Sequence, residues 1–175
     1  MWFENYQPTD AAVLGGKNSS LGTLFMAGLP VPPGFAVSAD CYRKALADDG
    51  LISELDALMA AVDTRDQACL AAAGQRARAL IDSLEPPADL AGAIRDAYAQ
   101  LCQRCEDHDV PVAVRSSATC EDSPDASFAG EHDTYLWIRG GDEVVRHVFR
   151  CWGSLFTDRG IATGWNGATA GSAPR

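Results

Sequence analysis

The chain has 175 residues, of which 47% are hydrophobic and 22% are charged, so it is long and apolar enough to bury the core of one domain. Its 24 acidic and 14 basic side chains give a net charge of −10, which argues against a nucleic-acid-binding protein, because phosphate-backbone binding requires a concentrated basic surface. The N-terminus has no basic start followed by an apolar core, and no stretch approaches the roughly 20 apolar residues of a membrane span, so we expect a cytoplasmic protein without a membrane partner.

The first expected elements follow the glycine pair at 15–16, which marks a tight turn. Apolar residues at helical spacing predict a helix after this turn: Leu21, Leu24, Phe25 and Leu29. Gly28 and Pro30 are stop signals for that helix. A short buried strand over 35–37 and a helix capped by Ser38 are expected next.

Residues 50–108 are rich in alanine and predict three amphipathic helices with little turn chemistry between them. We expect Thr64 to cap the second of these helices and Pro87 to stand in the first turn of the third. The charges of this segment are typical of a solvated surface, so the three helices are interpreted as scaffold.

Cys102 and Cys105 form a lone CxxC pair near the end of the third helix, with His108 close behind. A structural zinc site normally needs a second pair of ligands, and the sequence has none. Core packing is therefore favoured, while redox and metal roles stay open. The six cysteines of a chain without an export signal are expected to be reduced thiols.

A second strand is expected over 111–114, ended by Arg115, and a third over 134–138. Between them lies a loop of small polar residues over 116–130. After the third strand, one helical face is predicted from an apolar stripe: Val144, Val145, Val148, Trp152 and Leu155.

These elements predict an α/β fold in which a small mixed sheet is covered by helices, with the three helices of 50–108 as an added layer. The sheet is expected to be built from strands near Phe35, Val112 and Leu136. Residues 163–175 are mostly glycine, alanine, serine, threonine and asparagine, so they are expected to form a disordered tail beyond a domain of 1–162.

Several residues suit the binding of a phosphate group. Lys17 follows the glycine turn at a helix start, where free N–H groups and a mobile positive charge favour an anion. Arg115 ends an apolar strand where a loop begins, a position that suits bidentate phosphate binding. Gly130 lets backbone N–H groups approach a ligand, and Thr134 adds a hydroxyl donor. An exposed lysine and a salt bridge from Arg115 to a loop carboxylate are the alternative interpretations.

Four motifs follow one another along the chain: LGGKNSSLG at 14–22, GLPVPPGF at 28–35, VAVRSSAT at 112–119 and SFAG at 127–130. In this order they resemble the N-terminal ATP-binding domain of phosphoenolpyruvate synthase. The same domain type occurs in pyruvate, phosphate dikinase and in rifampicin phosphotransferase, and CWGSLFTDR at 151–159 also resembles the shared pattern.

The resemblance implies an ATP-grasp fold, in which two subdomains clamp ATP with Mg²⁺ and this chain supplies the first. The family pattern carries over Lys17 and Arg115 as phosphate-binding cations, and Gly130 and Thr134 as loop contacts to the nucleotide. It implies no catalytic residue here, because no histidine lies in the family's threonine-serine-histidine motif. It also implies no metal ligand in this chain, because the metal-binding carboxylates belong to the second subdomain.

Two residues depart from the family pattern. Glu131 and His132 stand where family members usually have glutamines. A carboxylate beside a polyphosphate repels it unless a cation or a proton intervenes, so these residues bear on the affinity for nucleotide.

The function expected from the resemblance is the ATP-binding part of a phosphoenolpyruvate synthase-like phosphotransferase. The complete enzyme converts pyruvate, ATP and water into phosphoenolpyruvate, AMP and phosphate. Because the other domains have no counterpart in 175 residues, we expect a truncated form that is inactive alone. Two alternatives stay open: the ATP-binding part of a rifampicin phosphotransferase-like or pyruvate, phosphate dikinase-like enzyme, and a non-catalytic module completed by a separate polypeptide.

Overall fold

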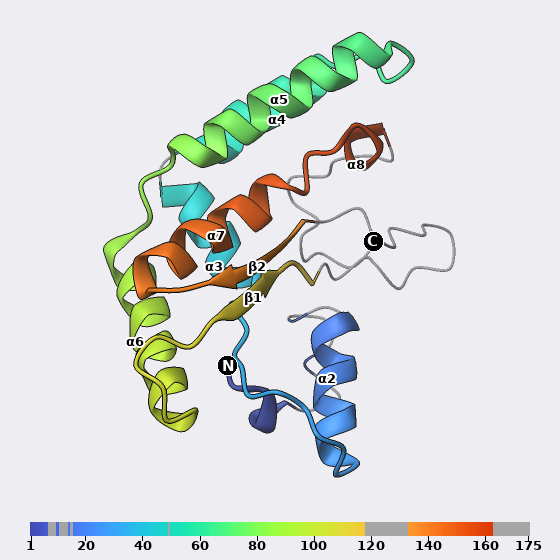
Figure 1. The fold of residues 1–175 in the computed structure, drawn as a ribbon. Helices are drawn as coiled ribbons and strands as arrows, with labels where there is room; N and C mark the ends of the chain where they lie inside the picture. The colour runs from blue at the N-terminus through green and yellow to red at the C-terminus, as the bar shows by residue number, and fades with distance from the viewer. Residues whose placement is uncertain (7–9, 11–13, 15, 49, 118–132, 163–175) are drawn as a thin grey trace.

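The computed structural model describes residues 1–6, 10, 14, 16–48, 50–117 and 133–162. Within them the chain forms a short 3-10 helix, seven α-helices and two strands (Figure 1). In chain order these are η1 (Phe3–Asn5), α2 (Gly16–Met26), α3 (Ala39–Asp48), α4 (Leu51–Ala60), α5 (Gln67–Ser83), α6 (Ala88–Arg104), β1 (Val112–Arg115), β2 (Thr134–Ile138), α7 (Gly141–Gly153) and α8 (Asp158–Ala162). No helix among these is long and apolar enough to cross a membrane.

The α/β class is confirmed, but the sheet differs from the prediction. In the described part of the chain, β1 and β2 form a two-stranded antiparallel sheet rather than a mixed one, with Arg115 opposite Thr134. The stretch around Phe35 makes only an isolated bridge with Trp2. The prolines at 32–33 precede it and have no N–H group to donate, which limits the ladder that this stretch can form. The predicted tail over 163–175 lies outside the described residues.

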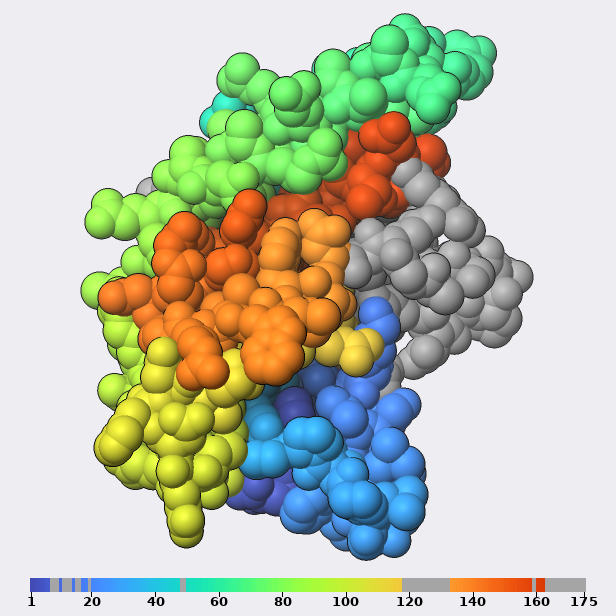
Figure 2. Space-filling view, in the orientation of Figure 1, coloured from blue at the N-terminus to red at the C-terminus, as the bar shows by residue number. Residues whose placement is uncertain are grey.

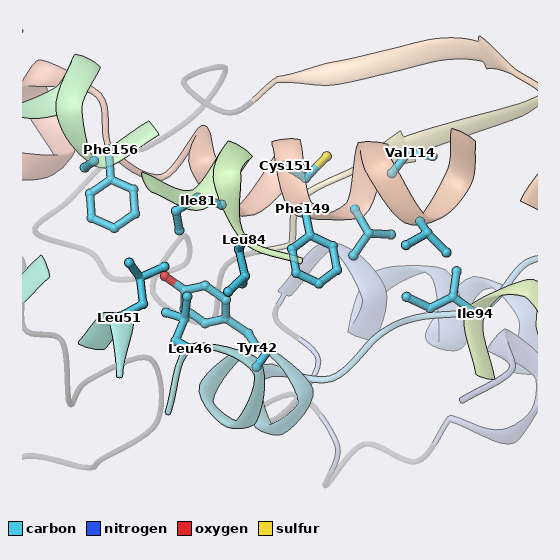
Figure 3. Close-up of a cluster of buried hydrophobic side chains, with 14 of the residues drawn as sticks. Tyr42, Leu46, Leu51, Ile81, Leu84, Ile94, Val114, Phe149, Cys151 and Phe156 are labelled. Carbon is cyan, nitrogen blue, oxygen red and sulfur yellow. The ribbon is translucent and has the colours of Figure 1, made fainter. Parts of the chain in front are cut away.

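The main core lies between the sheet and the helical layer. Its buried residues on α7 include Val144, Val145 and Val148 from the predicted apolar stripe. In Figure 3, side chains from α3, α5, α6, α7 and β1 meet in this one cluster. Phe156 and Ile81 have no exposed surface at all. The amphipathic pattern therefore identified the buried face of α7.

Two of the three predicted scaffold helices begin at different residues from those expected. The N-cap of α5 is Asp66, not Thr64, and its Oδ1 accepts hydrogen bonds from the N–H groups of Ala68 at 2.9 Å and Cys69 at 3.4 Å. A carboxylate satisfies these donors and also complements the positive end of the helix. Pro87 is the N-cap of α6 rather than a residue of its first turn.

The helix predicted after the glycine pair is α2, but it already includes Gly16, the second glycine of the predicted turn, and it ends at Met26, before the predicted apolar position Leu29. Gly28 forms the turn that ends it. Gly28 has a φ of 72°, and its N–H donates to the carbonyl of Phe25 while that of Leu29 donates to Leu24, the two hydrogen bonds of a Schellman motif. The apolar residues of α2 do not form a buried face, since Leu24 and Phe25 are each 42% exposed.

A second, smaller core, the N-terminal cluster, consists of Tyr6, Leu14 and Ala36 with Phe3 packed against them. The helix α2 lies against η1 here (Figure 1). Gly22 makes the approach possible, because a Cβ at this position would lie 2.7 Å from the Tyr6 Cβ. The N-terminal cluster is thus a packing unit apart from the main core.

The phenol of Tyr98 on α6 connects the helical layer to both strands. Its Oη lies 2.7 Å from Asp109 Oδ1 and 2.8 Å from the Val110 carbonyl, just before β1. The N–H of Gly140, just after β2, donates to Tyr98 Oη at 3.1 Å and to Asp109 Oδ1 at 2.8 Å. One hydroxyl and one carboxylate therefore attach one end of the sheet, where β1 begins and β2 ends, to α6.

We predict that Tyr98→Phe lowers the free energy of unfolding by about 1–3 kcal/mol, because it removes the hydrogen bonds that the buried hydroxyl donates to Asp109 Oδ1 and the Val110 carbonyl. Tyr135→Phe is the matched control, since its hydroxyl makes one exposed hydrogen bond, to Asp133 at 3.0 Å. That change should cost less than about 1 kcal/mol. Urea unfolding followed by circular dichroism measures both, and equal losses would contradict a special role for Tyr98.

Replacing either of two helical glycines by alanine should change the stability of the protein, but in opposite directions. Gly92→Ala on α6 should stabilise the protein by about 0.5–1 kcal/mol, because a Cβ there meets nothing within 4 Å and alanine favours the helix. Gly74→Ala on α5 should destabilise it, because the Cβ would lie 2.8 Å from the carbonyl oxygen of Phe156. Thermal unfolding of both variants tests the packing of α5, and stabilisation by Gly74→Ala would refute it.

Candidate functional site

The strand pairing places Arg115 and Thr134 next to each other at one end of the sheet. The two residues are register partners, and both side chains are exposed. Their neighbours Val114 and Tyr135 are also partners and belong to the main core or pack against it. Since successive residues of a strand point to opposite faces, the guanidinium and the hydroxyl share the outer face of the sheet.

The first turn of α2 reaches the same end of the sheet. The N–H of Asn18 donates to Ser117 Oγ at 3.2 Å, and Ser117 follows Arg115 by two residues. Figure 2 shows the beginning of α2 (blue) against the end of β1 (yellow), below β2 (orange). Lys17, which is half-buried, precedes Asn18 and is therefore brought to the end of the sheet that carries Arg115.

Two positive side chains lie where α2 meets the end of the sheet. The first turn of α2 contains no acidic residue, and the N-terminus of a helix has a partial positive charge. Lys17 and Arg115 add two full positive charges, in a chain whose net charge is −10. An anion with several negative oxygens is the ligand that this arrangement favours.

Three of the four predicted binding residues are thus brought to one end of the sheet by the Asn18–Ser117 hydrogen bond and the strand pairing: Lys17, Arg115 and Thr134. The fourth, Gly130, lies outside the described residues, as do the two departures from the family pattern at 131–132. The loop carboxylates weighed as salt-bridge partners of Arg115 lie outside them too. The roles of the four residues as ligands stay predictions.

The sequence did not point to one residue that lies where α2 meets the end of the sheet. Ser117 was part of a motif, but no role was predicted for its hydroxyl. The contact with Asn18 joins residues 99 positions apart, and no local pattern reports such a contact. A serine two residues after the strand-ending arginine was the only available signal.

On the inner side of β2, an aromatic ring of the strand packs against an imidazole ring of α7. The rings of Tyr135 and His147 meet edge to face with centroids 5.0 Å apart. Burial, with Asp133 as hydrogen-bond acceptor, raises the pKa of Tyr135 to about 12, so this phenol stays protonated near neutral pH. Burial also lowers the pKa of His147, with Arg150 and Arg146 acting in the same direction. The folded protein therefore favours the uncharged imidazole of His147 at the inner face of β2.

This contact predicts a pH dependence of stability. Because the pKa of His147 is lower in the folded than in the unfolded protein, the unfolded state binds the proton first as the pH falls below about 6.5. His147 should therefore contribute stability above that pH and lose it below, with a slope of at most about 1.4 kcal/mol per pH unit.

Urea unfolding of the wild type and of His147→Leu between pH 8 and pH 5.5 tests this, because leucine cannot bind a proton. The stability of the wild type should fall more steeply toward low pH than that of the variant. Parallel pH profiles would show that His147 does not titrate as its burial requires. His108→Gln, which replaces an exposed histidine, is the control.

Metal-ligating side chains do not gather in the part of the chain that is described. No group of three or more His, Cys, Asp or Glu residues there could hold a metal ion. Cys102 is buried in the main core, as predicted, and Cys105 is half-buried; both are free thiols. A cavity of about 530 Å³ at the end of α6 and one of about 450 Å³ beside α7 include none of the candidate binding residues.

Comparison with known families gives one match across most of the chain. Residues 11–163 match the family described as "Pyruvate phosphate dikinase, AMP/ATP-binding domain". The matched range includes all four predicted binding residues and both described strands.

Curated relatives match over the same region. The chain is 46% identical to a protein named "Probable phosphoenolpyruvate synthase" from Methanocaldococcus jannaschii, over 91% of this chain and 14% of the relative. It is 39% identical to "Phosphoenolpyruvate synthase" from Pyrococcus furiosus, over 90% of this chain and 23% of the relative. The protein of that name from Neisseria meningitidis is 42% identical, over 93% and 21%. The chain thus spans less than a quarter of the length of these relatives.

Proposed function

Because the chain belongs to the pyruvate phosphate dikinase AMP/ATP-binding domain family, we propose that it binds ATP by its phosphate groups where α2 meets the end of the sheet. One observation supports this most: the Asn18–Ser117 hydrogen bond and the Arg115–Thr134 pairing bring Lys17, Arg115 and Thr134 to one place. Transfer of a phosphoryl group depends mainly on positioning and on neutralising the charge of phosphate oxygens. Two cations beside a helix N-terminus suit that task.

Each residue has a distinct part in the proposal. The Lys17 ammonium is a compact charge on a flexible stem, and the Arg115 guanidinium presents a planar fork that matches two phosphate oxygens. Thr134, the register partner of Arg115, adds a hydroxyl that can donate a neutral hydrogen bond. Gly130 contributes a backbone N–H group. No residue of this chain is assigned a catalytic role.

We propose that Mg²⁺ binds together with the nucleotide. Mg²⁺ is usually held by one or two carboxylates together with substrate phosphates, and it supplies charge neutralisation between neighbouring phosphoryl groups. In the ATP-grasp arrangement that the family resemblance implies, the metal-binding carboxylates belong to the second subdomain. We propose on that basis that the carboxylate ligands of the ion come from outside this chain.

The wider activity is inferred from the relatives. We propose that the domain serves a phosphoenolpyruvate synthase-like phosphotransferase that uses ATP and water to convert pyruvate into phosphoenolpyruvate, AMP and phosphate. The names of the relatives favour this acceptor over rifampicin. The ATP-grasp fold, with this chain as its first subdomain, is part of the same proposal. The other domains are its partners, on the same or on a separate polypeptide.

The proposed site predicts ATP binding by the chain itself. In isothermal titration with ATP and Mg²⁺, Lys17→Ala and Arg115→Ala should each weaken the affinity by about 10-fold to 100-fold, because each removes a charged hydrogen-bond donor. Arg115→Lys should recover only part of the loss, since an ammonium lacks the planar fork.

Two matched controls come from basic residues on other elements. Lys44→Ala removes a lysine paired with Asp89 at 2.6 Å, and Arg76→Ala removes an arginine that lies 3.4 Å from Glu54. Both side chains are more than half exposed, and both variants should bind ATP like the wild type. A folded wild type that does not bind ATP, or equal losses in all four alanine variants, would refute the site.

A further inference from the structure

The proposed phosphate-binding residues belong to two different packing units. Lys17 lies on α2, which packs on η1 in the N-terminal cluster. Arg115 and Thr134 lie on strands whose inner residues pack in or against the main core. The distance between the Lys17 ammonium and the Arg115 guanidinium therefore depends on how one unit is held against the other.

Few polar contacts of the described residues join the two units. Arg104 at the end of α6 pairs with Glu4 and lies 3.6 Å from the centroid of the Trp2 ring, on the side of η1. At the first turn of α2, the contact is the hydrogen bond from the Asn18 N–H to Ser117 Oγ. This second contact is the one beside the proposed site.

The Asn18–Ser117 bond joins two segments that are far apart in the chain. Asn18 lies near the beginning of α2, and its acceptor, Ser117 Oγ, lies just after β1, 99 residues along the chain. The Ser117 hydroxyl therefore holds the beginning of α2 close to the strand that carries Arg115.

We propose that Ser117 is a positioning residue for nucleotide binding: it holds the first turn of α2, and with it Lys17, at the distance from Arg115 that lets both cations bind one polyphosphate. Ser117 acts through Lys17 and is not itself assigned a contact with the nucleotide. The inference rests on the proposed ATP site and adds a residue to it.

The test compares three single variants of the full chain by titration with ATP and Mg²⁺. Ser117→Ala should weaken the affinity about 5-fold to 10-fold, as expected for loss of one hydrogen bond. Ser117→Thr keeps the hydroxyl and should restore it. Ser116→Ala is the matched control, because the neighbouring Ser116 Oγ is buried without a hydrogen-bond partner among the described residues.

A double-mutant cycle shows whether Ser117 acts through Lys17. In the Lys17→Ala background, the further change Ser117→Ala should alter the affinity less than about twofold, because there is no ammonium left to position. An undiminished loss in that background would mean that Ser117 acts by another route and would overturn the proposal.

Amide hydrogen exchange at Asn18 provides a readout that does not depend on ATP. The Asn18 amide should exchange about 10-fold or more faster in Ser117→Ala than in the wild type and in Ser117→Thr. Faster exchange together with unchanged ATP affinity would overturn the positioning role and leave the ATP site intact. Absence of ATP binding by the folded wild type would overturn both proposals.

Discussion

The contact between the Tyr98 hydroxyl and the Asp109 carboxylate is the constraint on which the described architecture depends most. It joins α6 to the residues just before β1, and the Gly140 N–H adds the residue just after β2. A two-stranded sheet is marginal by itself in water, so it needs a rigid support. Tyr98 fixes one end of the strand pair, and α7 covers its inner face.

With one end of the sheet fixed, the strand register decides which side chains are exposed to solvent at the other end. Antiparallel pairing puts Arg115 opposite Thr134 and turns Val114 and Tyr135 toward the core. A shift of one residue would bury the guanidinium and expose the valine, because side chains alternate between the faces of a strand. The cost of burying a charge therefore selects the register that exposes the proposed phosphate-binding residues.

Local patterns were enough for most elements, and they failed where two segments meet. The apolar stripe of α7 and the glycine end of α2 were predicted correctly, since both depend on residues within a few turns. The predicted cap of α5, Thr64, lies two residues before the observed cap, Asp66, because threonine and aspartate are both good caps. The strand near Phe35 was predicted from apolar character, yet pairing depends on a partner edge that the local sequence does not reveal.

The sequence by itself determined the family, the helical layer and the residue types of the proposed site, because motifs such as those around Lys17 and Arg115 are read directly from the chain. Only the tertiary structure decided that these motifs meet, through a hydrogen bond between residues 99 positions apart and a strand register that aligns Arg115 with Thr134. The physical reason is that charge and helix periodicity are local properties. The place where a helix end meets a strand end is set by the packing of two separate cores.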